Sequence, residues 1–165
     1  MTMLNYAYCM RHPAMQLSAR HTMTTVKQLL EFKGHDIVTI EPDRTVYEAI
    51  KLLAERRIGA LLVIQGGKLV GLFSERDYAR KVVLKGKSSK DTPVRDVMIQ
   101  DLICVKPDAS VDECMTLMTE ERVRHLPVLD KGELVGIVSI GDAVRQIISE
   151  RDFTIRQLEQ YIASG

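Results

Sequence analysis

The chain carries one sequence pattern twice. Residues 37–43, Ile-Val-Thr-Ile-Glu-Pro-Asp, correspond to residues 102–108, Leu-Ile-Cys-Val-Lys-Pro-Asp, at a constant offset of 65 residues. The correspondence continues without a gap through Leu69-Val70-Gly71, which matches Leu134-Val135-Gly136. A duplicated segment predicts two similar folded units, related by a pseudo-twofold axis, and therefore two related clefts.

Each repeat is too short to have a large core of its own. The chain has 165 residues, of which 45% are hydrophobic and 27% are charged, as in ordinary globular proteins. A unit of about 60 residues buries a small fraction of its surface and is only marginally stable. We therefore expect the two repeats to share a core.

The order of local signals in each repeat is typical of a β-α-β-β-α unit. A short apolar strand, 37–40 or 102–105, is followed by a proline, a residue confined to strand ends and edges. Capping boxes at Thr45 and Ser110 then begin helices. Two apolar runs joined by a glycine-containing turn predict a β-hairpin. The predicted fold class is mixed α/β (α+β).

These signals divide the chain into five segments. They are an N-terminal tail at 1–24, a first repeat at 25–85, a linker at 86–93, a second repeat at 94–150 and a C-terminal helical tail at 151–165. The second helix of each repeat is expected at about 75–85 or 140–150, and apolar spacing predicts a separate short helix at 154–162.

Charge and composition argue against nucleic acid and membrane partners. The formal net charge of +1 provides no long-range field that would attract a polyanion or an anionic membrane. Tryptophan is absent and aromatic residues make up 5%, which leaves few surfaces for base stacking. The longest apolar run, 60–64, is far too short to cross a bilayer, and residues 1–24 lack the pattern of a signal peptide.

The reactive side chains form no catalytic or metal-binding signature. Cys9, Cys104 and Cys114 are scattered without CxxC spacing, which disfavours a metal site or a disulfide framework and favours a reducing, cytoplasmic location. No HExxH motif, phosphate-binding loop or nucleophile elbow occurs. We therefore predict that the protein is not an enzyme.

The most specific motif is Gly-x-x-Ser-x-x-Asp at a predicted strand-to-helix junction in each repeat. Its polar residues are Ser74 and Asp77 in the first copy and Ser139 and Asp142 in the second. An ionised carboxylate can accept hydrogen bonds from both hydroxyls of a sugar cis-diol, and helix N-termini favour phosphate. The same spacing is also a helix-capping pattern, with the serine hydroxyl on the third backbone N–H. Capping and ligand binding are compatible, and both interpretations stay open.

A second candidate motif is basic. The run 122–128, Arg-Val-Arg-His-Leu-Pro-Val, places Arg122, Arg124 and His125 just before a predicted strand. Arginine binds phosphate through its planar guanidinium, and histidine can add a proton-dependent contact. The alternative is a solvated rim of charge at a strand end. The first repeat has Gly59 and Ala60 at the matching positions, so the two clefts are not expected to be equivalent.

The paired motifs resemble those of tandem cystathionine-β-synthase (CBS) domains, the pair called a Bateman module. The resemblance covers about residues 25–148 and rests on the β-α-β-β-α repeat, the Arg-His-Leu-Pro-Val run, the Leu-Val-Gly strands and the doubled Ser/Asp motif. It implies binding of adenosine-containing ligands such as AMP, ATP, NAD or S-adenosylmethionine. It also implies face-to-face association, so that a homodimer is expected.

The resemblance implies two ligand sites, each assembled from both repeats. Site one would use Ser74, Arg76, Asp77, Ile103, Val123, Arg124, His125 and Pro127; site two would use Val38, Ile58, Gly59, Ala60, Leu62, Ser139 and Asp142. In site one, Asp77 would bind the ribose, and Arg124 and His125 the phosphate. Site two lacks the Arg-His pair, which puts phosphate binding there in doubt.

The expected function is a non-enzymatic adenine-nucleotide sensor. AMP is the first-choice ligand, because site one has charge for about one phosphate group. The signal would leave through a regulated protein in trans or through a change of oligomer. The alternative is a constitutive dimerisation or interaction scaffold, in which the Ser/Asp motifs only cap helices.

Overall fold

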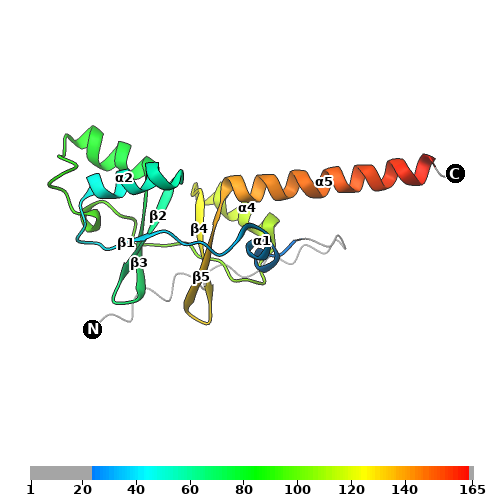
Figure 1. Ribbon diagram of the computed structural model, residues 1–165, viewed down its shortest axis with the longest axis horizontal. Helices are drawn as coiled ribbons and strands as arrows, with labels where there is room; N and C mark the ends of the chain where they lie inside the picture. The colour runs from blue at the N-terminus through cyan, green and yellow to red at the C-terminus, as the bar shows by residue number, and fades with distance from the viewer. Residues whose placement is uncertain (1–23, 164–165) are drawn as a thin grey trace. The chain divides into compact units, whose positions relative to one another are not determined.

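The computed structural model describes residues 24–163, which divide into two compact units (Figure 1). Among the described residues, the first unit contains residues 36–103, and the second contains residues 24–35 together with residues 104–163. Each unit has helices and a β-hairpin, so the predicted mixed fold is confirmed. The predicted N-terminal tail lies outside the described residues except for Thr24.

The first unit is built on a three-stranded sheet. Its strands are β1 (Thr39–Ile40), β2 (Ala60–Gln65) and β3 (Lys68–Ser74), in the order β1-β2-β3. β1 runs parallel to β2, and β2 pairs antiparallel with β3 as the predicted hairpin. The strand expected at 37–40 is thus shorter than predicted.

Helix α2 (Val46–Arg56) covers this sheet and begins at the predicted capping box. The Thr45 N–H donates to Glu48 Oε2 at 2.9 Å, and the Glu48 N–H donates to Thr45 Oγ1 at 3.2 Å. Val46, Ala49 and Leu53 of α2 point into the core. The other buried residues of this cluster are Ile40, Leu61, Val63, Phe73, Val82, Val94 and Val97.

The helix predicted at about 75–85 is irregular. It consists of α3 (Glu75–Asp77), a π-helical turn η1 (Tyr78–Val82) and a 3-10 turn η2 (Val83–Lys85). Gly86 then ends it in the left-handed region at φ +62°. The linker predicted at 86–93 follows and is largely exposed.

The second unit has the same hairpin and first helix. α4 (Val111–Glu120) begins at the predicted Ser110 capping box, and β4 (His125–Asp130) pairs antiparallel with β5 (Glu133–Ser139). The strand predicted at 102–105 does not form. Only Val105 makes a parallel bridge, to Val128, in the position that β1 occupies in the first unit.

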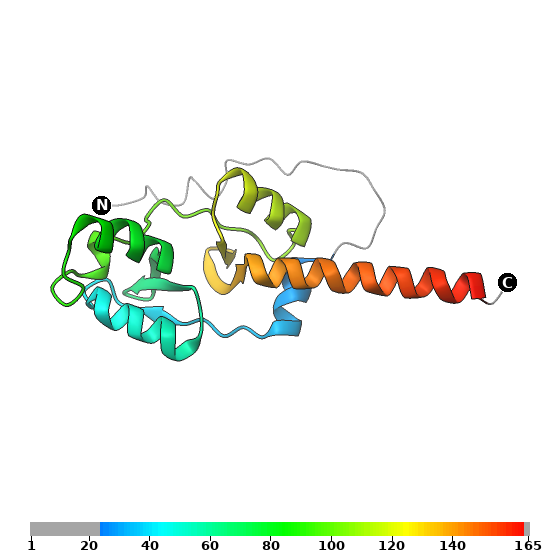
Figure 2. The ribbon, with the colours of Figure 1, turned by 90° about the horizontal axis from the view of Figure 1, so that it is seen from above.

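A single helix, α5 (Ile140–Ala163), replaces the two helices predicted at 140–150 and 154–162 (Figure 2). The expected break was wrong, because no glycine or proline lies between residues 150 and 154. The Thr154 hydroxyl instead donates to the Glu150 carbonyl at 3.0 Å, within the helix. Figures 1 and 2 show the second half of α5 extending beyond α4 and α1.

Each compact unit contains the first segment of the other sequence repeat. α1 (Val26–Lys33) packs in the second unit, where the Val26 N–H donates to the Ala109 carbonyl at 2.8 Å. The 3-10 turn η3 (Val94–Asp96) packs in the first unit, where the Val94 N–H donates to the Arg44 carbonyl at 2.8 Å. The compact units and the sequence repeats therefore have different boundaries.

Side-chain packing follows the same exchange. A Cβ added at Gly136 on β5 would lie 2.6 Å from Leu30 Cδ1 of α1. A Cβ added at the matching Gly71 on β3 would lie 2.5 Å from Met98 Sδ, just after η3. Glycine at these two positions thus lets the exchanged segment approach the hairpin closely.

Within residues 24–163, no helix is both long enough and apolar enough to cross a membrane. Cys114 is buried and Cys104 is partly buried, whereas Cys9 lies outside the described residues. Burial raises the pKa of the Cys114 thiol to about 12.

Candidate functional site

The first Ser/Asp motif forms a capping box where β3 meets α3. The Ser74 N–H and Oγ–H both donate to Asp77 Oδ2, at 3.0 and 2.6 Å, and the Asp77 N–H donates to Ser74 Oγ at 3.3 Å. The Lys81 Nζ lies 3.3 Å from Asp77 Oδ1. Asp77 is only 5% exposed. The capping interpretation is thus realised, while Oδ1 faces a single cation.

The second Ser/Asp motif forms the same cap at the start of α5. The Ser139 N–H donates to Asp142 Oδ2 at 2.9 Å, and the Asp142 N–H donates to Ser139 Oγ at 3.1 Å. Two cations also bind this carboxylate: Lys33 Nζ donates to Oδ2 at 2.7 Å, and Arg145 Nη2 donates to Oδ1 at 2.7 Å. Both oxygens of Asp142 are therefore occupied.

The environment of Asp142 favours its ionised form. Burial alone would raise its pKa, but the hydrogen bonds from Lys33 and from the Ser139 backbone and hydroxyl outweigh burial. The net result is that the pKa of Asp142 lies below its ordinary value. The carboxylate is therefore a stable anion at neutral pH, as a hydrogen-bond acceptor for hydroxyl groups must be.

Lys33 is a site residue that the sequence analysis missed. It lies in the last turn of α1, whose Val26, Leu29 and Leu30 are buried in the second unit. Its partner Asp142 is 109 positions away in the sequence. A pattern of short-range signals cannot reveal such a pair. The only local hint is a cation at a helix C-terminus, where the helix dipole favours positive charge.

In each unit, the entry to the hairpin lies beside the Ser/Asp helix. The Glu75 N–H donates to the Gly59 carbonyl at 3.2 Å, and Ala60 pairs with Ser74. In the second unit, the Ile140 N–H donates to the Arg124 carbonyl at 2.9 Å, and His125 pairs with Ser139. Each unit therefore gathers one Ser/Asp motif and one hairpin entry.

The remaining predicted site residues lie in or beside the same elements. In the first unit, the Leu62 N–H donates to the Val38 carbonyl at 3.2 Å, and Ile58 directly precedes Gly59 at the hairpin entry. Arg76 is in α3, and Ile103 is the last residue of the unit. In the second unit, Val123 is half-buried and Pro127 is buried in β4.

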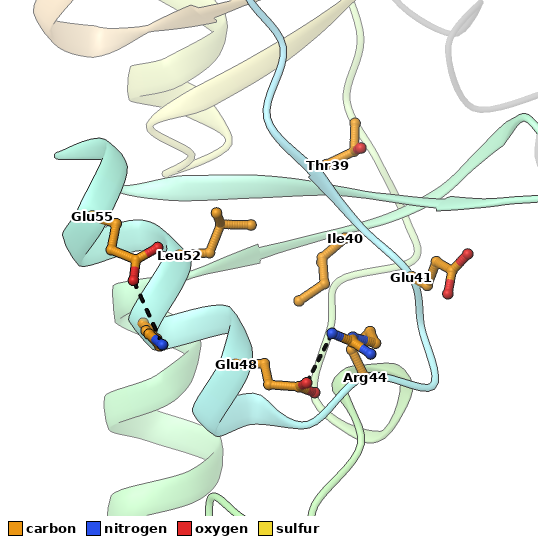
Figure 3. A pocket seen from close by; sticks show the side chains of 8 residues that line it. Thr39, Ile40, Glu41, Arg44, Glu48, Leu52 and Glu55 are labelled. Carbon is orange, nitrogen blue, oxygen red and sulfur yellow. Dashed lines mark ion pairs between the residues drawn. The ribbon is translucent and has the colours of Figure 1, made fainter.

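The first unit also has a surface hollow of about 400 Å³, whose lining does not include the Ser/Asp motif (Figure 3). It is lined by Thr39, Ile40, Glu41, Arg44, Glu48, Lys51, Leu52 and Glu55. Its cations are paired: Arg44 with Glu48 at 2.9 Å and Lys51 with Glu55 at 3.8 Å. Because carboxylates outnumber cations here, the hollow does not suit a phosphate group.

The part of the chain that the structure describes holds no cluster of three or more His, Cys, Asp or Glu side chains suited to a metal ion. The chemistry available at the two Ser/Asp motifs is instead hydrogen-bond acceptance by carboxylates at helix N-termini. Duplicated units of this kind, each with a hairpin followed by a Ser/Asp-capped helix, define a class of paired α/β repeats.

The chain belongs to the CBS-domain family, because the family model of the CBS domain matches residues 26–84 and 94–149. It is 37% identical over 162 residues to the mitochondrial CBS domain-containing protein CBSX3 of Arabidopsis thaliana, covering 93% of this chain and 79% of that protein. The expected cytoplasmic location stays a prediction, since that relative is named as mitochondrial.

Two solved structures extend the comparison. A protein with CBS domains from Burkholderia ambifaria is 53% identical, with a TM-score of 0.74. The match covers 76% of this chain and 95% of the Burkholderia chain. The CBS domain pair of protein MJ0100, solved with 5′-methylthioadenosine and S-adenosyl-L-methionine, is 27% identical, with a TM-score of 0.69. It covers 78% of this chain and 98% of that chain.

Proposed function

We propose that this CBS pair is a non-enzymatic regulatory module that binds an adenosine-containing ligand through its Ser/Asp motifs. AMP is the first choice, and NAD, ATP and S-adenosylmethionine are the other candidates. The observation that carries the proposal is the pair of largely buried carboxylates, Asp77 and Asp142, at matching helix starts. The adenosine ligands of the MJ0100 pair support adenosine as the shared part of the ligand.

The geometry at Asp77 suits a sugar diol. Its Oδ2 is used by the cap, while its Oδ1 faces the Lys81 ammonium at 3.3 Å. An ionised carboxylate offers about four lone-pair positions, so Asp77 has room to accept from ligand hydroxyls without losing its cap. Each such charge-assisted bond contributes about 1.5–3 kcal/mol.

The residue sets named from the family resemblance, one headed by Asp77 and one by Asp142, are proposed as the two ligand sites. Arg124 and His125 are the proposed phosphate ligands. Binding regulates only if the ligand prefers one conformation or one oligomer, because equal affinity for both shifts nothing. The protein that receives the signal is a further partner in trans.

A thermal-shift panel with AMP, ATP, NAD and S-adenosylmethionine tests this function. Binding to the folded state at 100 times the dissociation constant adds about 2.7 kcal/mol of apparent stability. We expect the Tm of wild type to rise with at least one ligand, and Asp77→Ala to abolish or strongly reduce that rise.

The matched control is Glu48→Ala. Glu48 completes the same kind of capping box as Asp77, at the start of α2, outside the proposed sites. Both alanine variants lose a cap worth about 1 kcal/mol. Only the Asp77 variant should lose the ligand response. An unchanged Tm of wild type with all four ligands, or equal ligand responses in both variants, would contradict the proposal.

The scaffold alternative is favoured by one observation, the exposed second half of α5. All residues from 151 to 163 are exposed, although an isolated helix of about 12–15 residues is marginal in water. Ile148, Ile155 and Ile162 recur every seven residues, with Leu158 between the last two. In a coiled coil, isoleucine at one core position of the seven-residue repeat and leucine at the other favours a parallel two-stranded assembly. We therefore propose that this face of α5 packs against α5 of a second copy.

A further inference from the structure

The ion pair between Lys33 and Asp142 is partly buried and joins a Ser/Asp motif to a cation from a distant segment, 109 positions away in the sequence. The two side chains are 25% and 11% exposed, and Lys33 Nζ lies 2.7 Å from Asp142 Oδ2. Arg145, which binds the other oxygen, is 75% exposed. Exposed pairs contribute little, whereas enclosed charge-assisted bonds are strong. Lys33 is therefore the main cation that competes with other hydrogen-bond donors for Asp142.

Within residues 24–163, the cation that contacts the first motif comes from the same helical segment and not from a distant one. The cation on Asp77 is Lys81, which lies on the next turn of the same helical segment, at 3.3 Å from Oδ1. Lys81 also donates to the Val97 carbonyl at 2.8 Å, so its charge is shared. The two carboxylates thus form similar caps but differ in the cations that contact them.

Lys33 also lies at the end of the segment that leaves the second unit. Gly34 follows it at φ +93°, a conformation that disfavours L side chains. The His35 Nδ1 lies 3.1 Å from the Val135 carbonyl oxygen, and residue 36 already belongs to the first unit. The Lys33–Asp142 contact therefore stabilises the last turn of α1, just before the chain passes from the second unit to the first.

We propose that Lys33 is a lock on the second Ser/Asp motif. Lys33, at 2.7 Å, competes with the hydroxyl groups of an adenosine ligand for Asp142 more strongly than Lys81, at 3.3 Å, competes for Asp77, so the first motif fills before the second. This inference rests on the proposed function. Opening of the ion pair also removes a side-chain contact from the last turn of α1, just before residues 34–38, which connect the two units in sequence.

Isothermal titration calorimetry with adenosine tests the lock, because adenosine carries no phosphate for Lys33 to attract. The titrations use the full chain with Asp77→Asn, so that the second motif is measured alone. Lys33→Met removes the ammonium and keeps an apolar stem. The matched control is Lys27→Met, which removes one exposed lysine from the same helix. Circular dichroism confirms that each variant is folded.

We expect Lys33→Met to tighten adenosine binding about tenfold, the factor that corresponds to one charge-assisted hydrogen bond at the low end of its range. Lys27→Met should leave the affinity unchanged, and adding Asp142→Asn to Lys33→Met should remove the gain. AMP is titrated in parallel. Weaker AMP binding with unchanged adenosine binding would show that Lys33 is a phosphate ligand and would overturn the lock.

Failure of the lock and failure of the proposed function give different results. If adenosine binds the Asp77→Asn chain with the same affinity whether or not Lys33 is present, the lock is wrong and the function stands. If neither adenosine nor AMP binds wild type or any variant, the proposed function is wrong and the lock falls with it.

Discussion

Replacing Gly136 by alanine should destabilise the second unit through a clash with the exchanged helix α1. The added Cβ would lie 2.6 Å from Leu30 Cδ1 and 2.8 Å from Cδ2. Leu30 is 1% exposed, so its side chain has no open space to move into. Overpacking of this kind costs about 1–3 kcal/mol of the free energy of unfolding.

A double-mutant cycle separates this clash from other effects of the substitution. Leu30→Ala alone should cost about 2–5 kcal/mol, since it leaves a cavity. In the double variant, the new methyl group enters that cavity, so the loss should be smaller than the sum of the two single losses by about 1 kcal/mol or more. Urea unfolding followed by circular dichroism gives each free energy.

Gly141→Ala is the control for this cycle. Gly141 lies in the first turn of α5, and the nearest atom to an added Cβ is Arg145 Nη1 at 3.6 Å, an ordinary contact. Alanine should therefore stabilise the chain by about 0.5–1 kcal/mol, through helix propensity. A loss at Gly136 below about 0.5 kcal/mol, or strict additivity with Leu30→Ala, would refute the packing of α1 against β5.

Three further predictions concern pH, thiol chemistry and self-association. The lowered pKa of Asp142 means that its pairing with Lys33 stabilises the fold fully above the unfolded value of about 3.9 and is lost as pH falls through the lower folded value. The stability gap between wild type and Lys33→Met, measured by urea unfolding, should therefore shrink below about pH 4; a gap that widens there contradicts the pairing. With Cys9 and Cys104 replaced by serine, Cys114 should not react with a thiol reagent at pH 8 until urea unfolds the chain, because burial raises its pKa to about 12. Labelling of the native protein within seconds would contradict that burial. Ile155→Glu should convert a dimer to a monomer in light scattering, whereas Phe153→Glu, on the opposite side of α5, should not. Equal behaviour of the two variants would exclude the proposed contact between two copies of α5.

The sequence predicts those parts of the fold that depend on neighbouring residues. The capping boxes at Thr45 and Ser110 and both hairpins form as expected, because their hydrogen bonds join residues that are close in the chain. The end of α2 at Arg57, with φ at +53°, also lies where the pattern placed it. These elements carry their own signals.

Long-range packing accounts for what the sequence did not predict. The helix α1 lies at the start of the first sequence repeat, yet it packs in the second unit, on Gly136. Lys33 reaches Asp142 only because of that packing. The continuous α5 was missed for a different reason, since a drop in apolar content after residue 150 looks like a helix end when the helix is in fact exposed.

The exchange of α1 and η3 has a consequence for fragments of this protein. A piece that stops at residue 85 lacks residues 92–98, whose main chain bonds to Arg44 and Val46. A piece that starts at residue 94 lacks α1 and leaves the pocket for Leu30 unfilled. Cutting the chain between its two sequence repeats would therefore produce two fragments that each lack part of a folded unit. Mixing these two pieces, rather than studying either alone, is the way to recover a native fold.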